Sequence, residues 1–173
     1  SGYLLLKNLT RPLPDTLKII DGVARFDGYT VEPTPHILAD EANKYQLFFI
    51  GPNDKIKVTL KKKEMVVTFL EGSPSHEIFR GLIVVQEPLQ QIGGSLQEAY
   101  KNPLANTDSL NQVMDKVNKK LRDNFYAFLK KNSSSEVTAF VIYSAINNDR
   151  NIKTTIADTM YNILTGKAKT CFY

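Results

Sequence analysis

The apolar residues between positions 110 and 129 follow the spacing of an amphipathic α-helix. They recur three or four residues apart and form the set Leu110, Val113, Met114, Val117, Leu121, Phe125, Phe128 and Leu129. Thr107 or Asp108 can supply the N-cap oxygen, while Lys130 and Lys131 stand where the helix dipole favours cations. Roughly 22 residues, each rising about 1.5 Å, span about 33 Å, which is enough to cross a small sheet. The pattern therefore predicts a long helix that covers a sheet.

The sheet is expected before this helix, where short β-favouring runs alternate with turn-like clusters. From Tyr45 onward these runs predict a β-meander with strands at residues 46–50, 55–60, 65–70 and 77–85. In the second run apolar residues alternate with Lys55, Lys57 and Thr59, which is typical of a sheet with one apolar and one solvated face.

The first 44 residues are less regular and contain short predicted strands. These strands lie at residues 3–6, 16–20, 23–26 and 29–31. Asp21-Gly22 and Asp27-Gly28 separate them and are hairpin signals, because Asp-Gly accepts the positive φ angles of a tight turn. Pro33 and Pro35 end the last run, and residues 36–44 are predicted to form a short helix.

The C-terminal third has weaker patterns. Residues 137–146 form an apolar run without clean alternation, which favours a strand buried on both faces. Residues 152–164 predict a second amphipathic helix that ends before Gly166, and residues 169–173 a last strand. Gly93-Gly94 is expected to form a turn ahead of a helical turn, where free backbone amides would attract an anion.

Together these patterns predict an α+β fold. A mainly antiparallel sheet, the β-meander, is expected to pack against the long amphipathic helix, with a second helix near the C-terminus. A chain of 173 residues can bury one core, so we expect a single α+β domain over residues 1–173, in which residues 1–44 are the less regular part. With 42% hydrophobic and 23% charged residues, the composition excludes disordered and collagen-like classes.

Groups that carry chemistry are scarce. His36 and His76 are the only histidines, and the single Cys171 can form neither an internal disulfide nor a cysteine-based zinc site. Phosphate-binding glycine loops and a Gly-x-Ser-x-Gly elbow are missing from the sequence. We therefore predict no catalytic residue, cofactor or metal ligand, and a protein that is more readily a binding protein than an enzyme. The single cysteine favours an intracellular compartment, with secretion as the alternative, and no apolar run is long enough to span a bilayer.

The net charge of +4 is unevenly distributed. Residues 1–50 hold 5 basic and 6 acidic side chains, whereas residues 51–173 hold 17 and 12. The excess lies in one predicted hairpin and in the long helix, at Lys55, Lys57, Lys61, Lys62, Lys63, Lys116, Lys119, Lys120 and Arg122. If the fold joins these two groups, they form a positive surface for phosphates, so nucleic-acid (RNA) binding is the second functional hypothesis.

Phe48 and Phe49 are adjacent in a predicted strand and must point to opposite faces of the sheet. A sheet covered by helices on one side only would expose one of them, and exposed apolar patches mark partner surfaces. The first hypothesis is therefore a non-enzymatic binding or interaction domain that acts through an apolar and basic surface, as a subunit, adaptor or partner-recognition protein. Its partner would be another protein or a second copy of the chain. An enzyme or small-ligand carrier is the third hypothesis.

Overall fold

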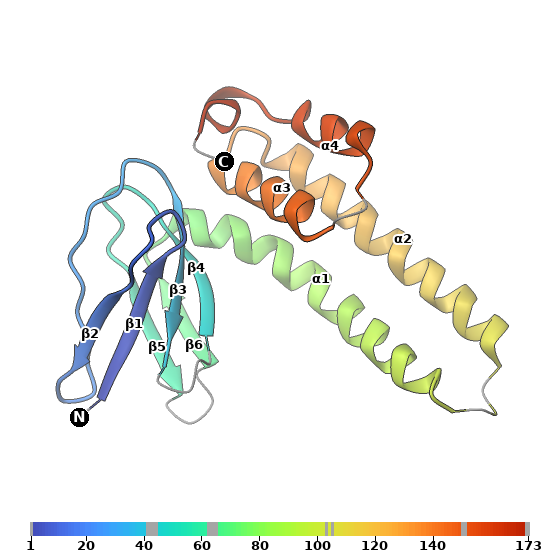
Figure 1. The fold of residues 1–173 in the computed structure, drawn as a ribbon, viewed down its shortest axis with the longest axis horizontal. Coiled ribbons are helices and arrows are strands. Elements are labelled where there is room, and N and C mark those ends of the chain that lie inside the picture. The colour runs from blue at the N-terminus through green and yellow to red at the C-terminus, as the bar shows by residue number, and fades with distance from the viewer. Residues whose placement is uncertain are drawn as a thin grey trace. The chain divides into compact units, whose positions relative to one another are not determined.

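The computed structural model describes residues 2–40, 45–61, 66–102, 104, 106–149 and 152–171. It confirms the α+β class, with an antiparallel sheet and a long helix (Figure 1). The elements in chain order are β1 (Gly2–Asn8), β2 (Asp15–Ile19), β3 (Thr34–Ala39), β4 (Tyr45–Ile50), β5 (Lys57–Lys61), β6 (Val66–Glu71), α1 (Pro74–Ala99), α2 (Thr107–Lys131), α3 (Glu136–Asn148), α4 (Thr154–Tyr161) and the 3₁₀ helix η1 (Gly166–Lys169).

The chain divides into two compact units, Ser1–Phe79 and Arg80–Tyr173, which are described one at a time. The expectations that the long helix covers the sheet and that the chain is one domain therefore stay predictions. None of the helices in the described part of the chain combines the length and the apolarity needed to cross a membrane.

The first unit contains an antiparallel four-stranded sheet in the order β2-β1-β3-β4 and the separate hairpin β5-β6. Asp21 and Gly22 have φ angles of 50° and 79°, and Ile20 bridges to Val23, so the predicted Asp-Gly turn is confirmed. The register places Leu6 opposite Leu38 and thus brings apolar side chains together on one face.

Buried side chains lie on both faces of this sheet. On one face Leu6, Leu38 and Phe48 are buried, and they are joined by the partly buried Leu4, Leu17, Ile50, Ile56 and Leu70. On the other face Phe49 is fully buried, and its ring centroid lies 5.2 Å from that of Phe79. Ser73 Oγ donates a hydrogen bond of 2.8 Å to the carbonyl oxygen of Phe49, which ties the start of α1 to β4.

In the second unit, Arg80–Ala99 of α1 and the helix α2 lie side by side (Figure 1). Tyr100 OH donates to Asn111 Oδ1 at 2.7 Å, and Asn124 Nδ2 donates to the carbonyl oxygen of Val85 at 3.2 Å. The helix predicted at residues 110–129 is confirmed as α2. Its N-cap is Asn106, whose side chain accepts from Ser109 N, and not Thr107 or Asp108.

The helix α3 forms the core of the second unit, because residues 137–142 are all buried. It packs against α4 and η1, and Thr138 Oγ1 donates a hydrogen bond of 2.7 Å to the carbonyl oxygen of Asn132. The strand predicted at residues 137–146 is therefore wrong. An unbroken apolar run suits a buried helix as well as a buried strand, and the Ser135 side chain caps this helix by accepting from Val137 N.

The predicted strand at residues 77–85 is also wrong, because these residues belong to α1. The less exposed positions of α1 include Gln86 and Gly93, which interrupt the apolar period of the helix. Val84 and Val85 are exposed, and as β-branched residues they favoured the prediction of a strand. Gly93 and Gly94 lie inside α1, where their amides belong to the helix. The predicted turn and its anion site are thus overturned.

The helix predicted at residues 36–44 is replaced over its described residues by β3, a central strand that pairs with β1 and β4. Pro35 is tolerated because the ladder with β1 begins only at His36. Residues 41–44 lie outside the described residues.

The remaining differences concern the ends of elements. The strands predicted at residues 23–26 and 29–31 do not form, apart from the bridge at Val23. The second amphipathic helix is confirmed as the shorter α4, while Gly166 begins η1 with a φ of 53°, so a 3₁₀ helix replaces the start of the predicted last strand. The strands β4, β5 and β6 confirm the first three strands predicted for the β-meander. The meander pairing is wrong over the described residues, because β4 pairs with β3 while β5 pairs with β6 in a separate hairpin.

Candidate functional site

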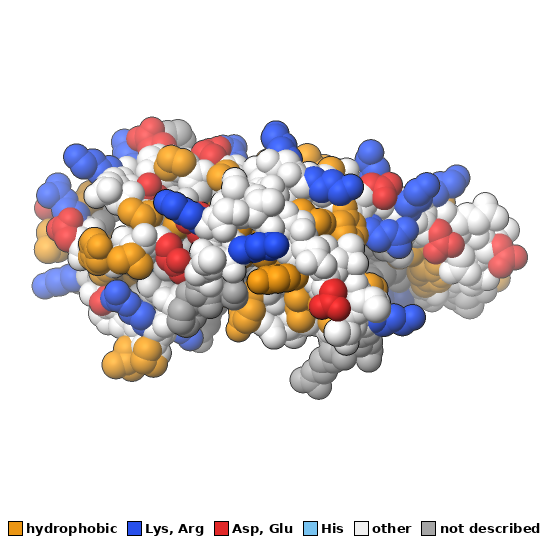
Figure 2. Space-filling view, turned by 90° about the horizontal axis from the view of Figure 1, so that it is seen from above, with side chains coloured by type: hydrophobic (Ala, Val, Ile, Leu, Met, Phe, Trp, Pro, Cys, Tyr) orange, Lys and Arg blue, Asp and Glu red, His pale blue; other side chains and the backbone are white. Residues whose placement is uncertain are grey.

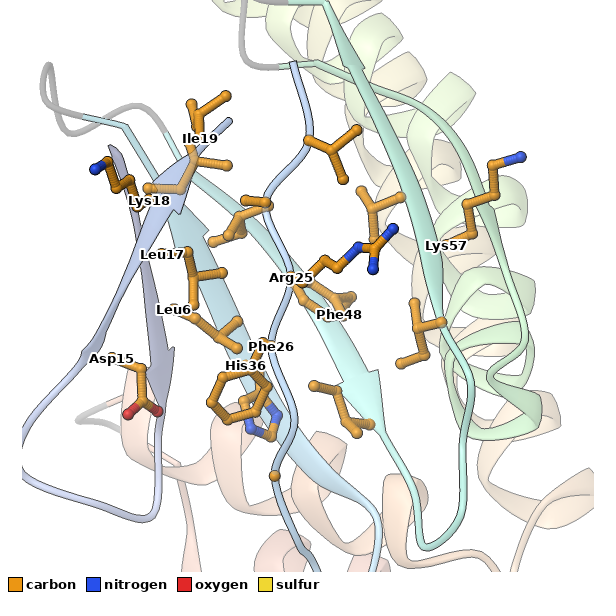
Figure 3. Close-up of a pocket in the computed structure, with 18 of the residues that line it drawn as sticks. Leu6, Asp15, Leu17, Lys18, Ile19, Arg25, Phe26, His36, Phe48 and Lys57 are labelled. Atoms are coloured by element: carbon orange, nitrogen blue, oxygen red, sulfur yellow. The ribbon is translucent and has the colours of Figure 1, made fainter. Parts of the chain in front are cut away.

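A pocket of about 1650 Å³ lies in the first unit (Figure 3). Its floor is the apolar face of the four-stranded sheet, and β5 contributes one wall. The apolar lining residues from these elements and their flanks include Leu4, Leu6, Leu17, Leu38, Phe48, Ile50, Ile56 and Val58. Strand alternation places the residues from β1 to β4 on one face of the sheet, where Leu6, Leu38 and Phe48 are buried, while Ile56 and Val58 come from the wall at β5.

An extended segment between β2 and β3 crosses this surface, and we call residues 24–31 the strap. In Figure 3 the strap runs between β1 and β2 on one side and β5 on the other. Within the described part of the chain, no backbone–backbone hydrogen bond involves the strap. In the same part, β2 pairs only with β1, and β5 pairs only with β6. The strap and the outer edge of β2 therefore have backbone groups available beside the pocket.

Exposed apolar side chains are concentrated in and beside the strap. They are Ile20, Val23, Phe26, Tyr29 and Val31, and all except Val31 line the pocket. A Cβ added at Gly28 would lie 2.5 Å from the Phe26 ring, so the glycine of Asp27-Gly28 permits a close approach of this ring. The predicted hairpin turn at Asp27-Gly28 is wrong, because no strands form on either side of it and neither residue has a positive φ. Exposed apolar groups beside an apolar floor are typical of a surface that is covered when a partner binds.

His36 is the buried polar group of this pocket. The register of β3 places it opposite Phe48, and the two ring centroids are 6.2 Å apart. Its Nδ1 lies 3.0 Å from the carbonyl oxygen of Thr34. Burial lowers the pKa of His36 from its ordinary value of 6.5, and Arg11 lowers it further, against the opposing effects of the Thr34 hydrogen bond and Asp15. The imidazole is therefore neutral near pH 7.

The lowered pKa of His36 predicts that the protein loses stability in mild acid. Below pH 6.5 the unfolded chain takes up the proton first, so the free energy of unfolding falls until the pH passes the folded pKa. His36→Gln removes this contribution. We expect thermal unfolding between about pH 7.5 and about pH 5 to shift less in the variant than in the wild-type protein. Equal shifts in both proteins would contradict the prediction.

The charged side chains that line the pocket balance each other. Four are basic (Arg11, Lys18, Arg25 and Lys57) and four are acidic (Asp15, Asp21, Asp40 and Asp54). The lining thus attracts neither anions nor cations as a class. The apolar floor dominates what the pocket can bind.

The lysines singled out in the sequence are divided between the two units. Lys55 and Lys57 are exposed in the first unit, whereas the side chain of Lys61 and the residues Lys62 and Lys63 lie outside the described part. In the second unit Lys116, Lys119, Lys120 and Arg122 are exposed on α2. Residues 80–173 hold 12 basic and 8 acidic side chains against 10 and 10 in residues 1–79, so the whole excess belongs to the second unit.

On the face seen in Figure 2, Lys and Arg side chains are interspersed with acidic and apolar ones and form no single continuous patch. The joining of the two lysine groups into one surface stays a prediction, and so does nucleic-acid binding.

Phe48 and Phe49 are both buried, so neither side chain forms an exposed partner surface. Phe48 belongs to the pocket side of the sheet, and Phe49 packs on the opposite side against Phe79. The sequence reasoning missed the strap and His36. The clustering of Val23, Phe26, Tyr29 and Val31 in a run between glycines and prolines was a signal for the strap, but it was interpreted as strands.

Among the residues that the structure describes, no group of three histidine, cysteine or acidic side chains could hold a metal ion. The candidate site is therefore the apolar pocket with its strap and its buried histidine. No protein-family model, no curated protein and no solved structure matches this chain.

Proposed function

We propose that the first unit is a partner-recognition domain that binds an extended, mainly apolar segment of another protein in this pocket. The observation that carries the proposal is the apolar sheet face beneath a strap whose backbone makes no backbone hydrogen bond in the described structure. This is a non-enzymatic binding role, in which the pocket supplies the apolar surface.

The size of the pocket supports a chain-like ligand. Pockets for small molecules usually measure about 300–1,000 Å³, and this one has about 1650 Å³. Its lining extends from β1 and β2 across β3 and β4 to β5. A peptide advances about 3.3 Å per residue when extended, so several residues can lie along such a surface.

The free backbone groups support an extended peptide over other elongated molecules. A peptide that adds as a strand gains main-chain hydrogen bonds, while its alternate side chains enter pockets of the receiving surface. The edge of β2 and the strap offer the donors and acceptors, and the sheet face offers the apolar surface. The balanced charges of the lining favour a segment without a large net charge.

This proposal predicts that a bound peptide is sensitive to backbone methylation at every second residue. A random peptide library would be panned against the full chain, and one enriched peptide would be synthesised with a single N-methyl group at each position in turn. Strand addition exposes alternate amides to the protein, so we expect affinity to fall about tenfold or more at alternate positions and little elsewhere. Enrichment of no peptide, or equal tolerance at every position, would overturn the proposal.

A matched pair of variants locates the peptide on the pocket. Tyr29 and Leu13 are each 79% exposed, but only Tyr29 lines the pocket. We expect Tyr29→Ala to weaken peptide binding about tenfold, because exposed tyrosines in binding surfaces often carry a large share of the affinity. Leu13→Ala should leave the affinity unchanged in the same titration.

A further inference from the structure

The tautomer of His36 follows from its hydrogen bond. A carbonyl oxygen can only accept, so the 3.0 Å contact with Thr34 requires the proton to be on Nδ1. In the neutral ring the other nitrogen, Nε2, then carries a lone pair and is an acceptor. Among the described residues no hydrogen bond is formed by Nε2, and this atom is not one of their buried polar atoms without a partner, so it is accessible from the pocket that His36 lines (Figure 3).

A ligand that covers Nε2 excludes solvent from it, so the acceptor becomes a costly buried group unless the ligand supplies a donor. The donor must suit its surroundings. Phe48 and Leu38 make the neighbouring floor apolar, and the charges of Arg11 and Asp15 act on the ring in opposite directions. The apolar floor disfavours a charged donor, and the lone pair of Nε2 disfavours a carboxylate.

We infer that the ligand presents an uncharged hydrogen-bond donor, a hydroxyl or an amide N–H, to Nε2 of His36, flanked by apolar groups on the sheet face. This inference rests on the proposed function and adds to it a rule for the bound segment. A serine, threonine, tyrosine or backbone amide satisfies the rule, whereas an acidic or basic side chain at this position does not.

Three probes that share a 4-propylphenyl group test the inference. They are 4-propylphenol, which has an uncharged donor, 4-propylanisole, which has none, and 4-propylbenzoate, which is anionic. Binding to the full chain would be followed by titration and by ¹⁵N NMR of labelled histidine, with the His36 signals assigned from the His36→Gln spectrum. We expect the phenol to bind about tenfold more tightly than the other two and to shift the Nε2 resonance in the direction of hydrogen-bond acceptance.

Two variants separate an acceptor from a merely structural histidine. His36→Gln keeps a side-chain acceptor and should keep part of the preference for the phenol, whereas His36→Leu should abolish it. If His36→Leu does not fold, the wild-type NMR titration still decides. Equal binding of the phenol and the anisole, an unmoved Nε2 resonance, or no binding of any probe would overturn the inference.

The outcome can be distinguished from failure of the proposed function. A phenol preference without any library peptide that binds would support the role of His36 and refute peptide recognition. The opposite result would be peptides that bind with alternating sensitivity to N-methylation and probes that all bind equally well. It would support peptide recognition and refute the role of His36.

Discussion

Phe49→Ala is expected to lower the free energy of unfolding by about 3–5 kcal/mol, which is the cost of deleting a fully buried aromatic side chain. The ring packs against Phe79, whose centroid is 5.2 Å away, and the carbonyl oxygen of the same residue accepts the hydrogen bond from Ser73. A cavity at this position removes packing between β4 and the first turn of α1. The measurement is urea unfolding of the full chain followed by circular dichroism.

The control for this variant is Tyr45→Ala in the same strand. Tyr45 is 63% exposed, so its truncation should change the free energy of unfolding by less than about 1 kcal/mol. If Phe49→Ala cost no more than Tyr45→Ala, the burial of Phe49 would be refuted. An exposed partner surface at this residue would then return to consideration.

Gly72→Ala is expected to have an effect of similar size for a different reason. Gly72 has a φ of 88°, and a Cβ there would lie 2.0 Å from the carbonyl oxygen of Lys55. The variant must therefore accept a left-handed conformation and also displace the backbone before β5. We expect a loss of about 3–4 kcal/mol in the free energy of unfolding.

Gly22 is the matched control for Gly72. Its φ is 79°, but no atom lies within 4 Å of the position where a Cβ would be built. Gly22→Ala should therefore cost only the conformational strain, about 1–2 kcal/mol. Equal losses in the two variants would show that the contact with Lys55 has no energetic importance.

The sequence predicted the elements whose periodicity is carried by apolar residues alone. The pattern that predicted α2 used only apolar residues between Leu110 and Phe128. Its helical period was therefore visible in the sequence, and the helix was found. The strands β4 and β5 were found because turn residues bound them and, in β5, lysines alternate with apolar residues. In these elements the local pattern and the tertiary environment agree.

The predictions were wrong where a local pattern fits either a helix or a strand and the tertiary environment decides between them. The apolar run of α3 shows no clear polar face over residues 137–142, because these residues are all buried in a helix that packs against α4 and η1, so its period is hidden. In α1 the less exposed positions Gln86 and Gly93 interrupt the apolar helical period. The β-branched residues nearby then favoured the wrong prediction of a strand.

The candidate site could be anticipated only in part. The sequence indicated an apolar binding surface near Phe48, and this residue does line the pocket, although as its buried floor. The importance of His36 depends on burial and on a backbone carbonyl two residues away, which no spacing of side chains reveals. The strap depends on the absence of strand pairing, and its composition resembles that of a strand.

The residues that stabilise the sheet differ from the exposed residues of the strap. The buried cluster of Leu6, Leu38 and Phe48 holds the sheet together, whereas Phe26, Tyr29 and Val31 are exposed. Under the proposed function, substitutions in residues 24–31 would alter recognition at little cost to folding. During evolution, or in the laboratory, this segment would then be exchanged while the sheet beneath it is kept.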